Sequence, residues 1–125
     1  MTGAVFDTGA LIALERADRS VELLISSARE AGSIISVPAG CVAQAWRMPA
    51  RQARLARFLR LRLVEVIPLT DSDARSVGLL LAASSTTDVV DAHVAVSALR
   101  LGEGVVTSDP ADILALGPSI DVRRV

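Results

Sequence analysis

The sequence predicts an α/β protein with a central parallel sheet of four to five strands and helices on both of its faces. Short β-branched runs alternate along the chain with segments whose apolar residues recur at helical spacing. Glycines, prolines and capping residues separate these segments. A length of 125 residues and a hydrophobic content of 51% suit a single domain that spans residues 1–125.

Five segments have the short, apolar and β-branched composition of strands. The first is an apolar run that ends directly at Asp7. At least one helix separates each strand from the next, which is the connection that parallel strands require. The predicted strands are residues 3–6, 33–37, 64–69, 104–107 and 120–125.

The helical segments have recognisable ends. Gly32 and Gly102 follow periodic apolar runs and are expected to cap the preceding helices. Pro49 interrupts a helical pattern and is expected to separate two helices. The predicted helices are one that begins at Thr8, and residues 20–31, 38–47, 50–62, 70 to about 84, 88–101 and 111–116.

The helix starts carry capping signals as well. Pro38 suits the first turn of a helix. Thr70 begins a helix with Asp73 three residues later, which resembles a capping box and makes Asp73 a predicted capping group. Thr86 or Thr87 is expected to cap the helix over residues 88–101.

Composition excludes several classes of protein. The formal net charge of −1 does not indicate a polyanion partner, and all 13 basic residues are arginine, so mechanisms that need a lysine are excluded. Cys41 is the single cysteine, which rules out an intrachain disulfide or a cysteine zinc site and suits a small core residue. The first residues lack a basic segment, and no uncharged apolar stretch approaches the ~18 residues of a membrane span. We therefore expect a cytoplasmic protein without a membrane segment.

Five aspartates lie where a parallel sheet of this kind binds ligands. Asp7 ends the first strand, Asp109 and Asp112 follow the fourth, and Asp88 and Asp91 lie one turn apart at the start of a helix. The carboxyl ends of parallel strands share one edge, so we expect these carboxylates to converge there. Clustered carboxylates stay ionised together around a hard cation such as Mg²⁺ or Mn²⁺. The pattern predicts a metal-dependent phosphodiesterase or phosphatase.

Each of these residues also has a purely structural interpretation. Asp7 and Asp109 are placed to cap the helices that follow them, and Asp88 suits the positive end of a helix dipole. His93 lies two residues past Asp91, so it points to another side of the helix and is interpreted as a packed or surface histidine.

Six arginines fall between Arg47 and Arg62, although the net charge of the chain is close to zero. Leu55 and Phe58 mark one side of the predicted helix in this region, and arginines occupy the other. The arginines form either a solvated face or a set of contacts to nucleic-acid phosphates. The predicted RNA-binding residues are Arg47, Arg51, Arg54 and Arg57.

Four segments together resemble one family. They read AVFDTGALIALE, ISVPAGCVAQAWR, DVVDAHVAVSA and VVTSDPADI, and with their order and spacing the chain resembles a PIN domain of the VapC toxin type along essentially its whole length. The resemblance implies a three-layer α/β/α sandwich and a ribonuclease that depends on Mg²⁺ or Mn²⁺. It further implies RNA substrates such as tRNA or rRNA, a homodimer, and inhibition by a cognate antitoxin.

The resemblance also implies roles for residues of this chain. Asp7, Asp91 and Asp109 match the catalytic and metal-binding acids, with Asp88 and Asp112 as further metal ligands, and Thr107 or Ser108 as a hydrogen-bond partner of a metal-bound water. Gln44 stands where the family usually has a glutamate. An amide oxygen can ligate a metal without contributing charge, so we expect weaker metal affinity, one metal ion rather than two, or a different fourth acid. The alternative is a PIN-like module that binds RNA or antitoxin without cleavage.

Two other families share features with this sequence. The segment FDTGA resembles the active-site triplet of aspartic proteases, but that fold is nearly all β, whereas this chain is mostly helical. Receiver domains also cluster aspartates beside a parallel sheet, but they need a lysine at a late strand end, and this chain has none. No GxxxxGK phosphate-binding loop occurs either.

Overall fold

The computed structural model describes residues 3–125, in which five parallel strands form one sheet in the order β3-β2-β1-β4-β5. The central strand β1 pairs with β2 on one side and with β4 on the other. The sequence predicted a parallel sheet of four to five strands, and the structure has five. The strands are β1 (Ala4–Phe6), β2 (Ile35–Pro38), β3 (Val64–Ile67), β4 (Gly104–Thr107) and β5 (Val122–Arg124).

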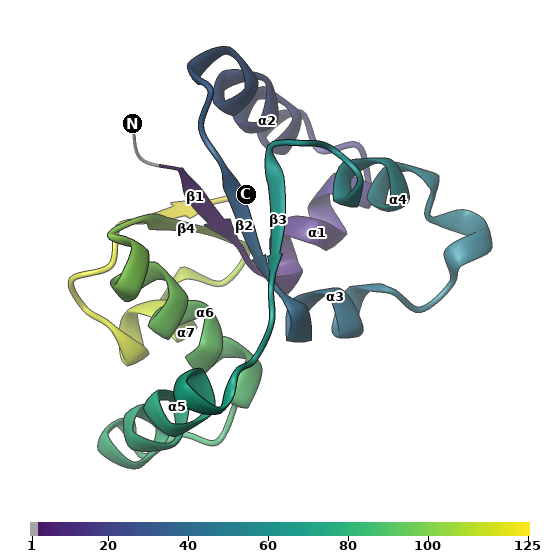
Figure 1. Cartoon of the computed structure of the whole chain (residues 1–125). Helices are drawn as coiled ribbons and strands as arrows, with labels where there is room; N and C mark the ends of the chain where they lie inside the picture. The colour runs from purple at the N-terminus through teal and green to yellow at the C-terminus, as the bar shows by residue number, and fades with distance from the viewer. Residues whose placement is uncertain (1–2) are drawn as a thin grey trace.

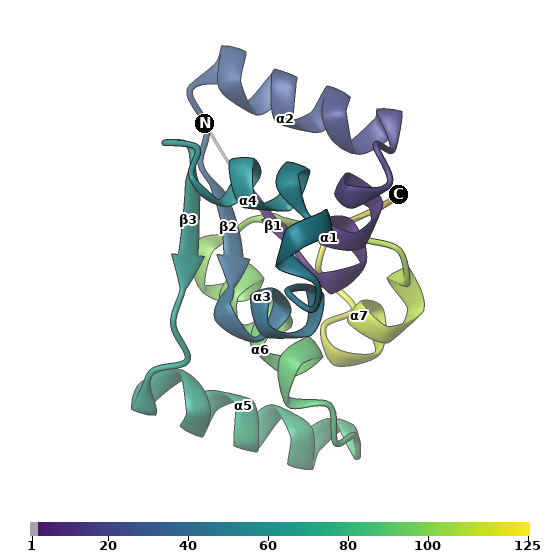
Figure 2. The same ribbon diagram turned by 90° about the vertical axis from the view of Figure 1, so that its right-hand side faces the viewer.

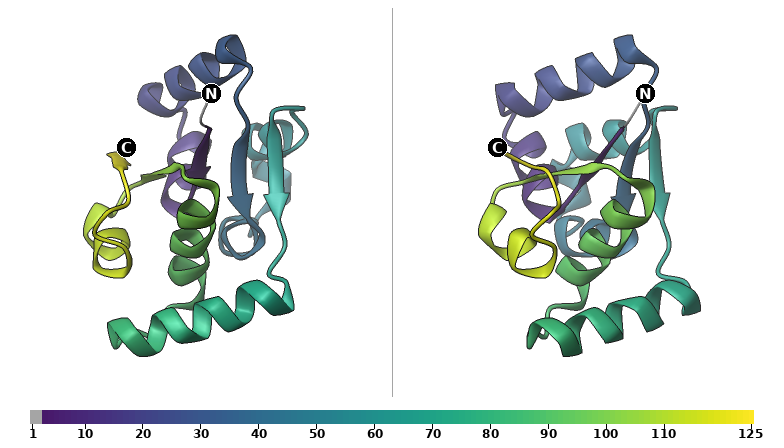
Figure 3. Two further views of the ribbon diagram at one scale, coloured as in Figure 1. Left: turned by 60° about the vertical axis from the view of Figure 1, so that its left-hand side comes forward. Right: turned by 90° about the vertical axis from the view of Figure 1, so that its left-hand side faces the viewer.

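Helices cover both faces of this sheet and complete a three-layer α/β/α sandwich, as predicted. Helices α1 to α4 lie on one side, and α6 covers the other (Figures 1 and 2). Figure 3 shows α5 crossing beyond the start of α6. The helical elements are α1 (Thr8–Glu15), α2 (Arg19–Ala31), α3 (Ala39–Ala45), the 3₁₀ turn η1 (Pro49–Arg51), α4 (Ala53–Leu59), α5 (Asp71–Ser84), α6 (Val89–Leu101) and α7 (Pro110–Leu116).

No single helix within residues 3–125 has the length and apolar composition to cross a membrane. Only α5 and α6 together reach the necessary length and composition, and this pair is bent by 108°.

The core is built from the apolar strands and from small residues of the covering helices. Val5 and Phe6 of β1 are buried, and the Phe6 ring stacks on Phe58 of α4 with centroids 5.6 Å apart. Ala92 and Ala95 of α6 have no exposed surface. Alanine side chains allow the backbone of α6 to approach the sheet closely, so both faces of the central strands are dry.

The two predicted glycine caps are confirmed, and the predicted N-cap of α6 is wrong. Gly32 and Gly102 have φ angles of 68° and 65° and cap α2 and α6 in the left-handed conformation. The N-cap of α6 is Asp88 rather than Thr86 or Thr87, because its Oδ1 accepts a hydrogen bond of 2.9 Å from the backbone N–H of Asp91.

The two helices predicted over residues 38–47 and 50–62 are both shorter than expected. Pro38 still pairs with Ile67 in the sheet, and α3 begins only at Ala39. Pro49 starts a 3₁₀ turn, and α4 begins only after Gln52. The buried Gln52 side chain accepts hydrogen bonds from two backbone N–H groups of the connecting loop, so these groups need no helical partner.

The capping box predicted at the start of α5 is only half formed. The Thr70 hydroxyl accepts from the backbone N–H of Asp73 at 3.1 Å, as expected. The Asp73 carboxylate does not turn back to the helix start, so its predicted capping role is wrong. It bonds instead to His93 Nε2 at 3.0 Å and to the Arg100 guanidinium, and thereby joins α5 to α6. The interpretation of His93 as a packed histidine is confirmed, since only 2% of it is exposed.

Asp73 is stabilised in its charged form although it is buried. Its hydrogen bond to His93 and the charge of Arg100 outweigh the effect of burial and hold the pKa of the Asp73 carboxyl below its usual value of 3.8. A depressed carboxyl pKa contributes stability that is present above pH 3.8 and is lost as the pH falls through the folded-state value.

We expect Asp73→Asn to lower the free energy of unfolding at pH 7 by about 2–3 kcal/mol, because it breaks a buried charged network. Urea unfolding measures this difference, which should shrink as the pH falls below about 4. Asp71→Asn is the matched control on the same helix, since the exposed Asp71–Arg75 pair is worth less than about 1 kcal/mol. Equal losses in the two variants would contradict the importance of the network.

Candidate active site

The order of the strands creates a switch point between β1 and β4. From β1 the chain proceeds through β2 to β3 on one side, whereas β4 and β5 lie on the other. The backbone N–H of Asp7, directly after β1, donates to the carbonyl of Val106 in β4 at 3.2 Å. Ligands of such sheets bind at the carboxyl ends of the strands beside the switch point. Asp7 and Asp109 follow the two strands that flank it.

Asp7 is a buried carboxylate that the start of α1 holds in place. Only 7% of it is exposed, and its Oδ1 accepts a hydrogen bond of 3.0 Å from the backbone N–H of Ala10. Burial raises the pKa of the Asp7 carboxyl, and the negative charge of Asp109 adds to that effect. Hydrogen bonds from Thr107 and from the backbone of Ala10 and Gly9 oppose the rise in pKa. Asp7 is therefore both the N-cap of α1 and one of the acids predicted for the site.

Thr107, the last residue of β4, joins Asp7 to the loop that carries Asp109. It has no exposed surface, and its Oγ1 accepts from the backbone N–H of Asp109 at 2.9 Å. Its hydroxyl also acts to lower the pKa of the Asp7 carboxyl. In this arrangement Thr107 holds the loop that carries Asp109 and lies near Asp7, whereas the sequence suggested a role beside a metal-bound water. A Cβ at Gly9 would lie 2.1 Å from Ser108 Oγ, so the close approach of α1 to this loop requires glycine.

Asp91 lies at the centre of the acidic cluster. Burial raises the pKa of its carboxyl to about 6, and the negative charges of Asp88, Asp112, Asp7 and Asp109 add to the rise, in that order. Asp88, Asp91 and Asp112 line one hollow of about 290 Å³. Asp7 and Asp109 do not line it, but they are near enough for their charges to act on Asp91.

The other three acids differ in their structural roles. Asp88 caps α6 through the backbone N–H of Asp91, so its structural interpretation is confirmed, while its charge still acts on Asp91. Asp109 occupies the N-cap position of α7, but its side chain makes no capping hydrogen bond to the described chain. The charge of Asp109 is the largest cause of a raised pKa at Asp112. Capping explains Asp88 but does not explain the Asp109 carboxylate.

The donor set fits a hard divalent cation. The side-chain groups are carboxylate, amide and hydroxyl oxygens, which Mg²⁺ and Mn²⁺ prefer. Burial raises the pKa of the Cys41 thiol to about 12, so this neighbour of Asp7 and Asp91 stays protonated and packs as a core residue. Among residues 3–125, no three Asp, Glu, His or Cys side chains lie near enough to share one ion as they stand. Mg²⁺ is usually held by one or two carboxylates with water and substrate oxygens, which this arrangement allows.

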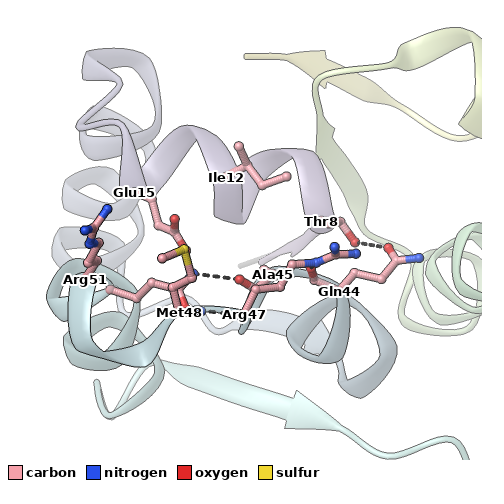
Figure 4. Close-up of a pocket in the computed structure, with 9 residues that line it drawn as sticks. Thr8, Ile12, Glu15, Gln44, Ala45, Arg47, Met48 and Arg51 are labelled. Carbon is pink, nitrogen blue, oxygen red and sulfur yellow. Dashed lines mark hydrogen bonds between the residues drawn. The ribbon is translucent and has the colours of Figure 1, made fainter.

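Gln44 lies on α3 at the edge of the acidic cluster. Its Oε1 accepts a hydrogen bond of 2.6 Å from the hydroxyl of Thr8, the residue that follows Asp7. Figure 4 shows Gln44 and Thr8 facing each other across the gap between α3 and α1. The amide is therefore held beside the residue that follows Asp7.

A groove of about 430 Å³ runs from this pair of residues between α1 and the segment that joins α3 to α4. Of the four arginines predicted to bind RNA, Arg47 and Arg51 line the groove. Arg54 and Arg57 are exposed on α4 and do not line it. The residues that line the groove are Thr8, Ile12, Glu15, Gln44, Ala45, Arg47, Met48, Arg51 and Gln52.

Gly9 and Gln52 shape this region and were not predicted from the sequence. The positioning role of Thr107 was not predicted either. Gly9 is the second residue of a helix, where glycine is unfavourable, and this mismatch was an available signal. Thr107 ends a strand beside the acids and was considered only as a partner of water. No local pattern marks Gln52, because its partner Glu15 is 37 residues away.

A model of the PIN domain family matches residues 4–114, so this chain belongs to the PIN domain family. The resemblance found in the sequence is thereby confirmed. A search of curated proteins finds no match.

Two solved structures have the same fold over nearly the whole chain. One is described as VapBC2 from Rickettsia felis bound to a DNA fragment from their promoter. Its TM-score is 0.74 at 15% identity, with 100% of this chain and 99% of that chain covered. The other is a toxin–antitoxin complex from Klebsiella pneumoniae, with a TM-score of 0.73, 17% identity, and coverage of 98% and 100%. At these identities the similarity establishes the fold.

Asp91 should make the metal-free protein less stable as the pH rises. A carboxyl whose folded-state pKa is raised from 3.8 to about 6 favours folding at low pH, and this contribution is lost as the pH rises through 6. In EDTA at pH 7.5, we therefore expect Asp91→Asn to unfold several degrees above the unmodified protein, with a smaller difference at pH 4. Mn²⁺ should raise the midpoint of the unmodified protein more than that of the variant. Thermal unfolding followed by circular dichroism tests this, and a less stable variant at pH 7.5 would contradict it.

Proposed function

We propose that this chain is a divalent-metal-dependent ribonuclease of the VapC toxin type, which hydrolyses phosphodiester bonds in RNA. The observation that carries the proposal is that Asp88, Asp91 and Asp112 line one hollow, with Asp7 and Asp109 near enough for their charges to act on Asp91. Membership of the PIN domain family and the similar fold of two toxin–antitoxin structures support it.

The residues of the site have separate tasks in this proposal. Asp7 and Asp91 bind Mg²⁺ or Mn²⁺, and Asp109 completes the catalytic set, with Asp88, Asp112 and Gln44 as further ligands of the ion or of its water. When bound, the ion lowers the pKa of a water molecule and neutralises charge on the scissile phosphate. Thr107 positions Asp7 and the loop that carries Asp109. Attack by water rather than by the ribose 2′-hydroxyl leaves a 5′-phosphate and a 3′-hydroxyl.

The proposal includes partners and a location. The RNA is a tRNA or an rRNA, and Arg47, Arg51, Arg54 and Arg57 contact its phosphates. A cognate antitoxin inhibits the enzyme, which acts in the cytoplasm as a homodimer.

A second candidate is a PIN-like module that binds RNA or antitoxin without cleaving RNA. The observation that favours it is Gln44, which brings no charge to a position where the family usually has a glutamate, and whose oxygen already accepts from Thr8. The two candidates differ in whether phosphodiester bonds are broken.

Incubation of total RNA with purified protein free of antitoxin tests the nuclease. In Mg²⁺ or Mn²⁺ we expect discrete cuts that end in 5′-phosphate, and no cuts in EDTA. Asp91→Asn should reduce the cleavage rate at least about a hundredfold, because it removes a charged ligand from the central position.

Asp121→Asn is the matched control for this experiment, since Asp121 is exposed and precedes β5, at the opposite edge of the sheet. Its cleavage rate should equal that of the unmodified protein. Folded protein that cuts no faster than Asp91→Asn would leave the binding module as the function, and 2′,3′-cyclic phosphate ends would contradict attack by water.

We expect Gln44→Glu to bind Mn²⁺ roughly tenfold or more tightly, because a carboxylate near the ion adds a favourable charge interaction of a few kcal/mol at an effective dielectric of about 20. Isothermal titration calorimetry measures this affinity. Ala43→Glu is the control, because it adds the same charge one residue earlier, where the helix points elsewhere. Equal or weaker binding by Gln44→Glu would mean that Gln44 does not face the ion.

A further inference from the structure

The groove between α1 and the α3–α4 connection begins beside Asp7, because Thr8, the next residue in the chain, lines it. Thr8 and Gln44 form its near end, and Thr8 follows Asp7 in the chain (Figure 4). Its volume of about 430 Å³ falls within the roughly 300–1,000 Å³ of typical small-ligand sites. A ligand whose phosphate reaches the acidic cluster therefore has room for its neighbouring group in the groove.

A buried amide holds the far wall of this groove in place. Gln52 is 5% exposed, and its Oε1 accepts from the backbone N–H groups of Arg47 at 3.1 Å and Met48 at 3.0 Å. Its Nε2 donates to the carbonyl of Ala45 at 2.6 Å and to Oε1 of Glu15. All four hydrogen-bonding positions of the amide are used, so it fixes the loop against α1. A site held in this way is organised before a ligand arrives.

The groove offers one wall for phosphate and one for a base. The Nε of Arg47 donates to the carbonyl of Gln44 at 2.9 Å, which leaves the two terminal nitrogens of its guanidinium for a phosphate. Ile12 and Met48, with 38% and 55% of their surfaces exposed, provide apolar contacts for a ring.

Glu15 supplies the polar group at the far end. In the described chain its hydrogen bond from Gln52 uses Oε1, which leaves Oε2 as an acceptor toward the groove. A carboxylate oxygen accepts from the exocyclic amino group of cytosine, adenine or guanine, whereas uracil has no such group.

We propose that this groove binds the nucleotide next to the scissile phosphate, and that Glu15 selects a base with an exocyclic amino group. The inference rests on the proposed RNA substrate. The two arginines that line the groove, and its position beside the residue that follows Asp7, favour a nucleotide over a peptide as the occupant. Gln52 is a positioning residue, because it acts through Arg47, Met48 and Glu15 without touching the base.

Fluorescence anisotropy with labelled single-stranded hexanucleotides tests the proposal. Oligo(C), oligo(A) and oligo(U) are titrated with protein free of antitoxin in EDTA, where metal-dependent cleavage does not occur. We expect oligo(C) or oligo(A) to bind roughly tenfold more tightly than oligo(U), as for one charge-assisted hydrogen bond.

Glu15→Gln gives a sharper result than removal of the side chain. The amide oxygen of the new glutamine still accepts from Gln52, so its NH₂ group faces the groove and replaces an acceptor with a donor. Preference for amino bases should disappear or turn toward uracil, while the thermal unfolding midpoint stays unchanged. Glu22→Gln, an exposed glutamate on α2, is the matched control and should keep the original preference.

The arginines should act on every sequence alike. Arg47→Ala and Arg51→Ala are expected to weaken all three oligonucleotides to a similar degree and to reduce the salt slope by about one each. Arg62→Ala, before β3 at the opposite edge of the sheet, should leave affinity and slope unchanged.

The outcomes separate this inference from the proposed function. Base preference that Glu15→Gln reverses, in protein that does not cleave RNA, would support the groove and overturn the nuclease. Metal-dependent cleavage without base preference, or with a preference that Glu15→Gln leaves intact, would support the nuclease and overturn the groove. If no oligonucleotide binds, the groove is not a nucleotide site. A protein segment would then be its occupant.

Discussion

Repulsion among carboxylates at one edge of the sheet is the constraint on which this site depends. The strand order brings Asp7 and the loop after β4 together at the switch point, and α6 adds Asp88 and Asp91. Each acid lies at or near the start of a helix, at the N-cap or in the first turn of α1, α6 or α7. Partial positive charge at helix N-termini stabilises carboxylates, so three helices together offset part of the repulsion. Burial, and after it the charges of the other four acids, still raise the pKa of Asp91 to about 6.

Two buried aspartates of this chain differ in whether a cationic side chain lies beside them. Asp73 and Asp7 are 4% and 7% exposed. His93 and Arg100 lower the pKa of Asp73, whereas the pKa of Asp7 is raised even though three hydrogen bonds oppose the rise. The difference is a cationic partner. The fold gives the structural carboxylate cationic partners but gives none to the carboxylate at the switch point. The switch point therefore stays negatively charged and can bind a cation. Sites that lower stability in this way are typically kept for function.

The sequence predicted the parts of the structure that local patterns determine. Strand ends, helix periodicity and glycine caps are local, and with the rules for parallel sheets they sufficed to bring five aspartates to one edge. The partners of Asp73 and the Glu15 partner of Gln52 were not predictable in this way, because they lie 20 to 37 residues away along the chain. The capping-box pattern at Asp73 looked sound locally, but a buried histidine and an arginine competed successfully for its carboxylate. The helix expected from residue 50 began later because Gln52 satisfies the loop backbone.

Chemistry and selectivity occupy different parts of this surface for a physical reason. Every nucleotide presents the same phosphate, so an acidic centre that acts through a cation cannot distinguish one RNA sequence from another. Discrimination requires contacts to a base, and these need a neighbouring, rigid and partly apolar surface. The groove that begins at Gln44 has these properties, and the hydrogen bond between Gln44 and Thr8 lies at the boundary of the two regions. An uncharged amide at that boundary limits the repulsion that an incoming phosphate meets there, whereas a glutamate would bind the ion more strongly. In the proposed enzyme, the residue at position 44 would therefore set a balance between metal affinity and access of the substrate.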